Sequence, residues 1–411
     1  MSHPLHTRSF RLLFVGRSLS LIGDAAIPAA LSLAVYLATG STGDLALVLA
    51  CAMVPKLLLL PLGGVVGDRF NARTVALTTD LVRCVTQLFV GAELLSGTPA
   101  LWQIAVAEAI GGAAGAFSMP TVSPLIRGTV AESGLLRANA LMAVVGSAAR
   151  IGGPAVAGAL VLTAGPGWAF VLDGATFAVS AALLAAIEVR HVPIPRRSLI
   201  GDLKEGWGEV RSRDWYWTSL IAHAAWNGAA AVLMTLGPAL FLRDLGGEGA
   251  WLAFLQTGAV GLLAGSLVAG RVRPRRPVLT ANLGGALYAL PLCLLAAHAP
   301  VGVAVVAYGA AMAGLGFLNP VWETAVQSAV PAHVLARVTS YDWLLSLGAM
   351  PLGYALAPLA DSTWGPEVPL AIAGLLVGSA CLATAAVPGV RRFKAPAEPV
   401  EAVTRTTGTP A

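Results

Sequence analysis

The chain has 411 residues, of which 56% are hydrophobic and 11% are charged, and its formal net charge is +5. An ordinary soluble domain has roughly a quarter of its residues charged, so this composition excludes a soluble globular protein and predicts an integral membrane protein. The four cysteines lie in apolar stretches without a Cys-x-x-Cys spacing, and we expect no disulfide framework, metal site or cofactor.

Apolar stretches long enough to cross a bilayer recur along the chain. A membrane helix needs about 20 apolar residues, and such spans are found at 11–38, 44–66, 74–95, 100–123, 138–163, 167–188, 216–242, 249–270, 277–297, 300–324, 338–360 and 367–388. The first is too long for a signal-peptide core of about 7–15 residues. The predicted fold class is therefore an all-α integral membrane protein with twelve transmembrane helices.

The basic residues predict the orientation of these spans. If both termini are cytoplasmic, 21 of the 26 Lys and Arg residues fall in cytoplasmic segments, one, Arg243, falls in an outer loop, and four lie within spans. This asymmetry follows the positive-inside rule. We therefore expect a multi-pass protein of the cell (plasma) membrane with both termini in the cytoplasm, in contact with lipid and not with nucleic acid.

The two halves of the chain resemble each other at a constant offset of 200 residues. Seven residues recur in this way, namely Phe117, Pro120, Val130, Leu135, Arg137, Ala149 and Gly153, matched by Phe317, Pro320, Val330, Leu335, Arg337, Ala349 and Gly353. The repeat predicts two pseudo-symmetric six-helix bundles. The predicted domains are an N-terminal bundle over 1–190, a cytoplasmic central loop over 191–214, a C-terminal bundle over 215–390, and a disordered cytoplasmic tail over 391–411.

The central loop carries apolar residues at near-helical spacing, at Leu199, Leu203, Trp207 and Val210, among charged residues. This pattern predicts an amphipathic helix on the inner membrane surface. A plain linker between the two bundles is the alternative.

Ionisable side chains are expected deep within the spans at five positions, Asp24, Lys56, Glu108, Arg150 and Asp173. Each would cost at least about 2.5–3.5 kcal/mol at the bilayer centre, so each needs a partner, water or a function. A carboxylate in a low dielectric tends to keep its proton near neutral pH, which is the chemistry that a proton-coupled carrier requires. The alternative is a structural ion pair of Asp24 with Lys56 or Arg150.

Two further charged residues lie in the third span. Asp80 and Arg83 are three residues apart, a spacing that brings two side chains together on a helix surface. We expect them to form an ion pair along that helix, near its inner end.

The loop after the second span reads Gly64-Val65-Val66-Gly67-Asp68-Arg69-Phe70-Asn71-Ala72-Arg73. It resembles the signature G-x-x-x-D-R-x-G-R-R/K of the major facilitator superfamily, with matches at Gly64, Asp68, Arg69 and Arg73. Asn71 replaces the signature glycine, and we expect it to adopt a left-handed turn.

The fifth span contains Gly153-Pro154, which resembles the G-P-x-x-G-G element of the proton-driven drug exporters of that superfamily. The arginine motif of the fourth span is missing, and Glu108 is the charge found there. The chain as a whole is similar to the macrolide-efflux and enterobactin-exporter branch, on the evidence of Gly23-Asp24, Pro55-Lys56, Asp80 with Arg83, and Trp168-Ala169-Phe170.

The resemblance implies roles for these residues. In the superfamily the loop motif is a cytoplasmic latch, which would assign gating to Gly64, Asp68, Arg69 and Arg73, together with Gly153 and Pro154. Asp68 would meet the positive N-terminus of a neighbouring helix, while Arg69 and Arg73 would reach nearby acidic residues. A short basic loop without a latch function is the alternative.

The superfamily lines its central cavity with the first, fourth, seventh and tenth helices. This places on the cavity, as candidates for proton coupling or substrate binding beside Lys56 and Arg150, the residues Asp24, Glu108, His223, Trp226, Asn227, Asn319 and Trp322. The two tryptophans either stack on a flat ligand or pack within the bundle. His223 is either a hydrogen-bonded residue between helices or a proton carrier.

The sequence contains no G-x-x-x-x-G-K-[S/T] loop and no recognisable nucleophile motif, so we expect neither an ATP-driven pump nor an enzyme. The expected function is a monomeric bacterial secondary transporter of the multidrug-efflux type, which exports small amphipathic or hydrophobic compounds by proton antiport and alternating access. The alternatives are a dedicated exporter of a siderophore or other secondary metabolite, a proton-independent facilitator or importer, and a receptor or scaffold that transports nothing.

Overall fold

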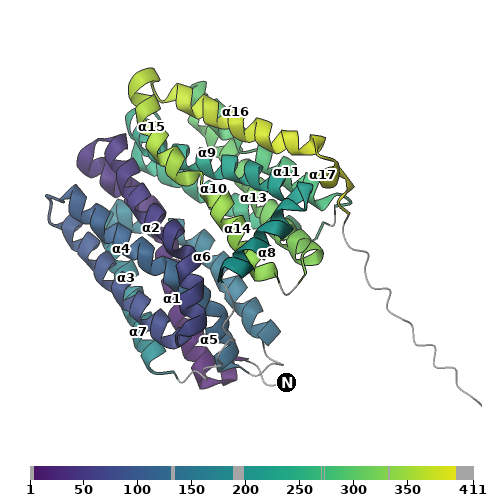
Figure 1. Ribbon diagram of the computed structural model, residues 1–411. Coiled ribbons are helices and arrows are strands. Elements are labelled where there is room, and N and C mark those ends of the chain that lie inside the picture. Colours follow the sequence, from purple (N-terminus) through teal and green to yellow (C-terminus); the bar gives the residue numbers. More distant parts are fainter. Residues whose placement is uncertain are drawn as a thin grey trace, which may run out of the picture.

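The computed structural model describes residues 4–130, 135–187, 199–269, 271–272, 274–331 and 334–394, and these ranges contain helices and no strand. The first group of helices comprises α1 (Arg8–Thr39), α2 (Thr42–Arg69), α3 (Ala72–Leu95), α4 (Leu101–Ser118), α5 (Val122–Thr129), α6 (Leu135–Ala164) and α7 (Gly167–Ala185). The short 3-10 helix η1 (Pro4–His6) precedes α1, and a second one, η2 (Met119–Thr121), joins α4 to α5. This group lies on one side of the molecule in Figure 1, in purple and blue.

The second group follows the helix α8 (Leu199–Arg211). It comprises α9 (Asp214–Asp244), α10 (Gly247–Ala269), α11 (Pro277–Ala286), α12 (Ala289–Ala296), α13 (Val301–Ala329), α14 (Leu335–Leu347), α15 (Met350–Trp364), α16 (Glu367–Ala383), η4 (Thr384–Ala386) and α17 (Pro388–Arg392). The green and yellow helices of Figure 1 form this group.

Eleven of the described helices or helix pairs are long and apolar enough to cross a membrane. The remaining predicted span is α4, whose 18 residues include Glu108, and which packs against α2 and α3 like a member of the bundle. With α4 included, the helices correspond one by one to the twelve predicted spans.

Three of these spans are divided into shorter helices, each with a proline at or near the break. Proline has no N–H group, so the carbonyl four residues before it loses its helical partner. Pro120, Pro291 and Pro351 lie within or just after the breaks, which are η2, the residues between α11 and α12, and the residues between α14 and α15.

The two groups pack by the same scheme, which confirms the pseudo-symmetric architecture. In the first group α2 packs against α4, α1 against α6 and α7, and α3 against α7. In the second, α10 packs against α13, α9 against α15 and α16, and α12 against α16. The repeated glycines occupy matching places, because a Cβ on Gly153 would lie 2.4 Å from the Cβ of Ala25 on α1, and one on Gly353 would lie 2.5 Å from the carbonyl of Gly228 on α9.

The predicted central loop contains helix α8, as its periodicity indicated. This helix packs against α14 and α9, and the ring centroid of its half-exposed Trp207 lies 5.6 Å from that of Tyr341. The predicted boundary between residues 190 and 191 and most of the tail over 391–411 lie outside the described residues, so these domain limits stay predictions.

The two groups contact each other at one end of the molecule, the end that carries the α1–α2, α9–α10 and α15–α16 turns, which we call the α1–α2 end. There the Thr42 hydroxyl donates to the Asp361 carboxylate at 3.2 Å, and the Trp251 indole N–H donates to the Ser32 hydroxyl at 3.3 Å. The guanidinium of Arg243 lies 5.9 Å from the ring centroid of Tyr36.

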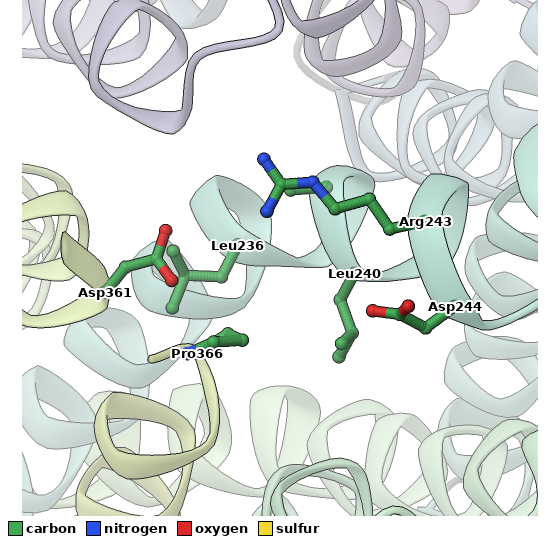
Figure 2. A pocket seen from close by; sticks show the side chains of 7 residues that line it. Leu236, Leu240, Arg243, Asp244, Asp361 and Pro366 are labelled. Carbon is green, nitrogen blue, oxygen red and sulfur yellow. The ribbon is translucent and has the colours of Figure 1, made fainter. Parts of the chain in front are cut away.

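A small pocket lies at this same end. Its lining residues are Leu236, Ala239, Leu240, Arg243, Asp244, Asp361 and Pro366. Figure 2 shows Arg243 from α9 and Asp361 from α15 both projecting into it. The pocket therefore combines apolar and charged side chains of the second group.

Candidate functional site

An ion pair between α3 and α1 lies in the middle of the first helix group. The Arg83 Nη1 donates to the Asp24 Oδ2 at 3.0 Å, and its Nη2 donates to the Oδ1. The guanidinium also lies over the ring of Phe177 on α7, 4.2 Å from the centroid. The Arg83 side chain is 18% exposed and that of Asp24 is 35% exposed, so the pair is buried mainly on the arginine side.

Two more carboxyl groups surround this arginine. Glu108 on α4 and Asp173 on α7 are 6% and 0% exposed, and both interact electrostatically with Arg83 and Asp24. Among the described residues, the Glu108 Oε1 and both carboxyl oxygens of Asp173 have no hydrogen-bond partner. Gln87 on α3 lies beside Glu108.

Helix α1 passes directly beside the Asp173 carboxyl because residue 23 is glycine. A Cβ on Gly23 would lie 2.3 Å from the Asp173 Oδ1 and 2.7 Å from the Thr176 hydroxyl. The glycine therefore brings Asp173 next to the backbone that carries Asp24. We call Asp24, Arg83, Glu108 and Asp173 the Arg83 cluster.

A second ion pair lies nearby and ties four helices together. The Arg17 Nη1 on α1 donates to the Asp80 Oδ1 on α3 at 3.4 Å, and its Nη2 donates to the Ser118 hydroxyl at 3.1 Å. The Ser180 hydroxyl on α7 donates to the Asp80 Oδ2 at 2.7 Å. Asp80 is fully buried, and both of its carboxylate oxygens accept hydrogen bonds from side chains of other helices.

The predicted ion pair of Asp80 with Arg83 along one helix is therefore wrong. Helix α3 packs between α4 and α7 and begins at Ala72, which places Arg83 near its middle and not at its inner end. Both side chains consequently face neighbouring helices, where each has a partner of opposite charge.

The alternative for Asp24, a structural ion pair with Lys56 or Arg150, named the wrong partner, because Asp24 is paired with Arg83. Lys56 on α2 lies along α4, its Cδ and Cε 4.0 Å from where a Cβ on Gly115 would be, and it interacts electrostatically with Arg83 and Asp24. Arg150 on α6 is exposed and interacts electrostatically with Glu323 on α13, in the other helix group.

Trp322 belongs to an aromatic cluster in the second helix group. Its ring stacks on Tyr216 at a centroid distance of 5.2 Å, and its indole N–H donates to the Asp342 Oδ2 at 2.7 Å. The Tyr216 hydroxyl donates to the same oxygen at 2.9 Å, and the Ser346 hydroxyl donates to the other at 3.2 Å. In this structure Trp322 is packed, and a role in stacking on a ligand stays a prediction.

His223 and its neighbours on α9 continue this region. The His223 ring meets Trp322 edge-on at 4.7 Å, and the Trp226 ring lies 4.5 Å from that of Tyr288. The His223 Nε2 and the Trp226 Nε1 are buried and have no hydrogen-bond partner in the described part of the chain. Asn227 donates to the carbonyl of His223 at 2.9 Å, and Asn319 is half-buried on α13.

The latch residues are described only in part. The surroundings of Gly64 and the side chains of Asp68 and Arg69 are not described by the structure, so their latch role stays a prediction. Arg73 does not reach an acidic residue as expected; its Nε donates to the Leu184 carbonyl at 2.8 Å, where α7 ends and a cation meets the negative end of the helix dipole.

Asn71 corrects a second expectation about this loop. Its φ is −62°, so the predicted left-handed turn is wrong, and its side-chain oxygen instead accepts from the Arg73 backbone N–H at 2.9 Å. Asn71 is thus the N-cap of α3, a position that asparagine favours. Gly153 packs against α1 at Ala25, and Pro154 follows within α6.

Reasoning from the sequence missed Arg83 as a site residue and did not include Asp173 among the site candidates. The position of Arg83 about halfway along a 24-residue span was the signal that could have identified it. Charge at that depth is costly without a partner from another helix.

Comparison of the sequence with known proteins finds relatives that match most of the chain. The model of the Major Facilitator Superfamily matches residues 13–345. The chain is 24% identical over 388 residues to an uncharacterized MFS-type transporter, YvqJ of Bacillus subtilis, covering 91% of each chain. It is 24% identical over 346 residues to the multidrug efflux pump Tap of Mycobacterium tuberculosis, covering 79% of this chain and 80% of Tap.

Solved structures agree on the fold. A POT family transporter in complex with a thioalcohol-conjugated peptide superposes with a TM-score of 0.74 at 14% identity, covering 92% of this chain and 96% of the transporter. The nucleoside transporter NupG superposes with a TM-score of 0.72 at 12% identity, covering 94% of this chain and 100% of NupG.

Proposed function

The chain belongs to the Major Facilitator Superfamily, and we propose that it exports small amphipathic or hydrophobic compounds from the cytoplasm in exchange for protons. Membership of this family makes it a multi-pass secondary transporter of a small molecule and not an enzyme. The Arg83 cluster is the observation that carries this proposal. The similarity to the efflux pump Tap supports the outward direction.

The cluster has more acidic than basic groups at its centre. The carboxyl groups of Asp24, Glu108 and Asp173 outnumber the two described cations that act on them, Arg83 and Lys56. Asp80 also lies near Arg83, but it is paired with Arg17. Leaving a buried charge without its partner is strongly destabilising, so the carboxyl groups without an ion pair need protons. A cluster that must hold protons, and can release them when its helices move, is what antiport requires.

The contacts between the helix groups fit this transport direction. We propose that both termini are cytoplasmic, as the basic loops predict, so that the α1–α2 end faces outward. The contacts of Thr42 with Asp361 and of Ser32 with Trp251 then close the outer side. In alternating access, these contacts would separate when the cargo leaves.

Transport by inverted membrane vesicles tests the proposal. A panel of fluorescent amphipathic dyes is added to vesicles that contain the full chain, and an imposed proton gradient should drive dye accumulation. An uncoupler should abolish this accumulation. Dye movement that is unaffected by the proton gradient would contradict the antiport and leave a facilitator.

A further inference from the structure

Among the described carboxyl groups, that of Asp173 has the environment least compatible with a negative charge. It is fully buried, and neither of its carboxyl oxygens has a hydrogen-bond partner among the described residues. The neighbouring Thr176 hydroxyl lies beside the Asp173 carboxyl, and it donates its hydrogen bond to the backbone carbonyl of Asp173 at 2.7 Å. An ionised carboxylate in such a place would be uncompensated.

The charged groups around Asp173 come from three helices. They are Asp24 from α1, Arg83 from α3 and Glu108 from α4. Helix α6 also packs against α7, but both of its arginines, Arg137 and Arg150, are exposed. Arg83 is thus the cation that can neutralise Asp173, and it already binds Asp24.

The position of Arg83 brings both carboxyl groups within its range. Phe177, on which the guanidinium rests at 4.2 Å, follows Asp173 by four residues on α7, and residues four apart lie on the same face of a helix. The guanidinium therefore lies one helical turn from Asp173 while it binds Asp24. A short movement along the face of α7 would exchange one partner for the other.

We infer that Asp173 holds the transported proton and that Arg83 binds Asp24 and Asp173 in alternation during the cycle. When the proton leaves Asp173, the new carboxylate takes over the guanidinium, and Asp24 takes up a proton from water in its place. One proton is released and one is bound, so the net charge of the cluster is unchanged. The 35% exposure of the Asp24 side chain makes it the group that exchanges with water. This inference rests on the proposed proton coupling.

Infrared spectroscopy of the full chain in lipid, without any substrate, tests the inference. A protonated carboxyl group has a C=O stretching band that an ionised one lacks, and 13C labelling of aspartate separates its band from that of Glu108. We expect an aspartate band in the wild type at neutral pH, its loss in Asp173→Asn, and its retention in the control Asp44→Asn at the start of α2. Absence of the band in the wild type would overturn the inference, and so would its persistence in Asp173→Asn.

The alternating role of Arg83 has its own readout, which also serves if Asp173→Asn does not fold. In Asp24→Asn the guanidinium loses its present partner and should neutralise Asp173, so the aspartate band should disappear although residue 173 is unchanged. Arg83→Lys should retain the wild-type band. A band that persists in Asp24→Asn would show that Arg83 only holds α3 against α1, and would overturn the exchange. A wild-type protein that has the band but moves no dye would contradict the proposed export alone.

Discussion

Arg83 on α3 donates from both terminal nitrogens to the two carboxylate oxygens of Asp24 on α1. This two-point contact joins helices that are distant in the sequence. It lies beside the carboxyl groups of Glu108 and Asp173, which have no ion pair among the described residues. A bidentate pair of this kind fixes the orientation of both side chains as well as attracting them. Any helix movement that separates α1 from α3 must leave both Arg83 and Asp24 without their present partners.

Breaking this pair should destabilise the protein. We expect Asp24→Asn and Arg83→Gln each to cost roughly 1–3 kcal/mol, less than for a fully buried pair because Asp24 is partly exposed. The double variant should cost less than the sum. Thermal unfolding in detergent measures all three. Additive single effects would contradict a direct energetic coupling between the two residues.

Two neighbouring glycines of α6 should respond oppositely to alanine. A Cβ on Gly153 would lie 2.4 Å from that of Ala25, and overpacking of this kind costs about 1–3 kcal/mol. Gly152 has no atom within 4 Å of such a Cβ in the described part of the chain, so Gly152→Ala should be neutral or stabilise the helix by up to about 1 kcal/mol.

Dye export should follow the same order, because Ala25 adjoins Asp24 and a shift of α1 would disturb the Arg83 pair. The two variants are matched controls for each other in expression level and unfolding temperature. Equal effects of the two substitutions would show that this close contact does not constrain α1.

Locking the α1–α2 end should stop transport. Thr42 on α2 and Asp361 on α15 are hydrogen-bonded at 3.2 Å, so cysteines at these positions should be joined by a short thiol crosslinker. The background variant lacks Cys51, Cys84, Cys293 and Cys381. We expect crosslinking to reduce dye export to background and a reducible linker to restore it after cleavage. Full export by the crosslinked double variant would mean that the two helix groups need not separate here, and each single-cysteine variant controls for modification alone.

Trp322 should contribute to stability through its N–H group. Trp322→Phe keeps an aromatic ring beside Tyr216 but removes the hydrogen bond to Asp342, and a hydrogen bond to a charged group is worth about 1.5–3 kcal/mol. We expect a lower unfolding temperature and an unchanged KM for dye export. A raised KM at unchanged stability would instead support the predicted contact between this ring and the ligand.

The helical fold could be predicted from the sequence because bilayer thickness fixes the length of each apolar span. The repeat at an offset of 200 also had a physical basis, since Gly153 and Gly353 both allow close contact with the first helix of their own group. What the spans could not reveal was which face of each helix meets which neighbour. That information decides every ion pair.

One error at the site follows from this gap, and a second has a local origin. Asp80 and Arg83 have the spacing of a pair on one helix, yet their partners, Arg17 and Asp24, lie on α1. Asn71 was expected to replace a left-handed glycine, but its short polar side chain instead caps α3. For Asp80 and Arg83, local spacing predicted a local contact, and a neighbouring helix supplied the partner of each. For Asn71, the family signature predicted a backbone conformation, and the side chain instead satisfied a free backbone N–H group.

Proton movement triggered by substrate is the most direct test of the central claim, that the Arg83 cluster couples export to protons. Full-length protein is reconstituted in liposomes that contain a pH-sensitive dye, and an amphipathic compound identified in the vesicle assay is added at zero proton gradient. The wild type should move protons opposite to the compound, and Asp24→Asn, Glu108→Gln and Asp173→Asn should each lose most of this signal while Asp44→Asn retains it. Transport of the compound by the wild type without any proton movement would contradict the claim.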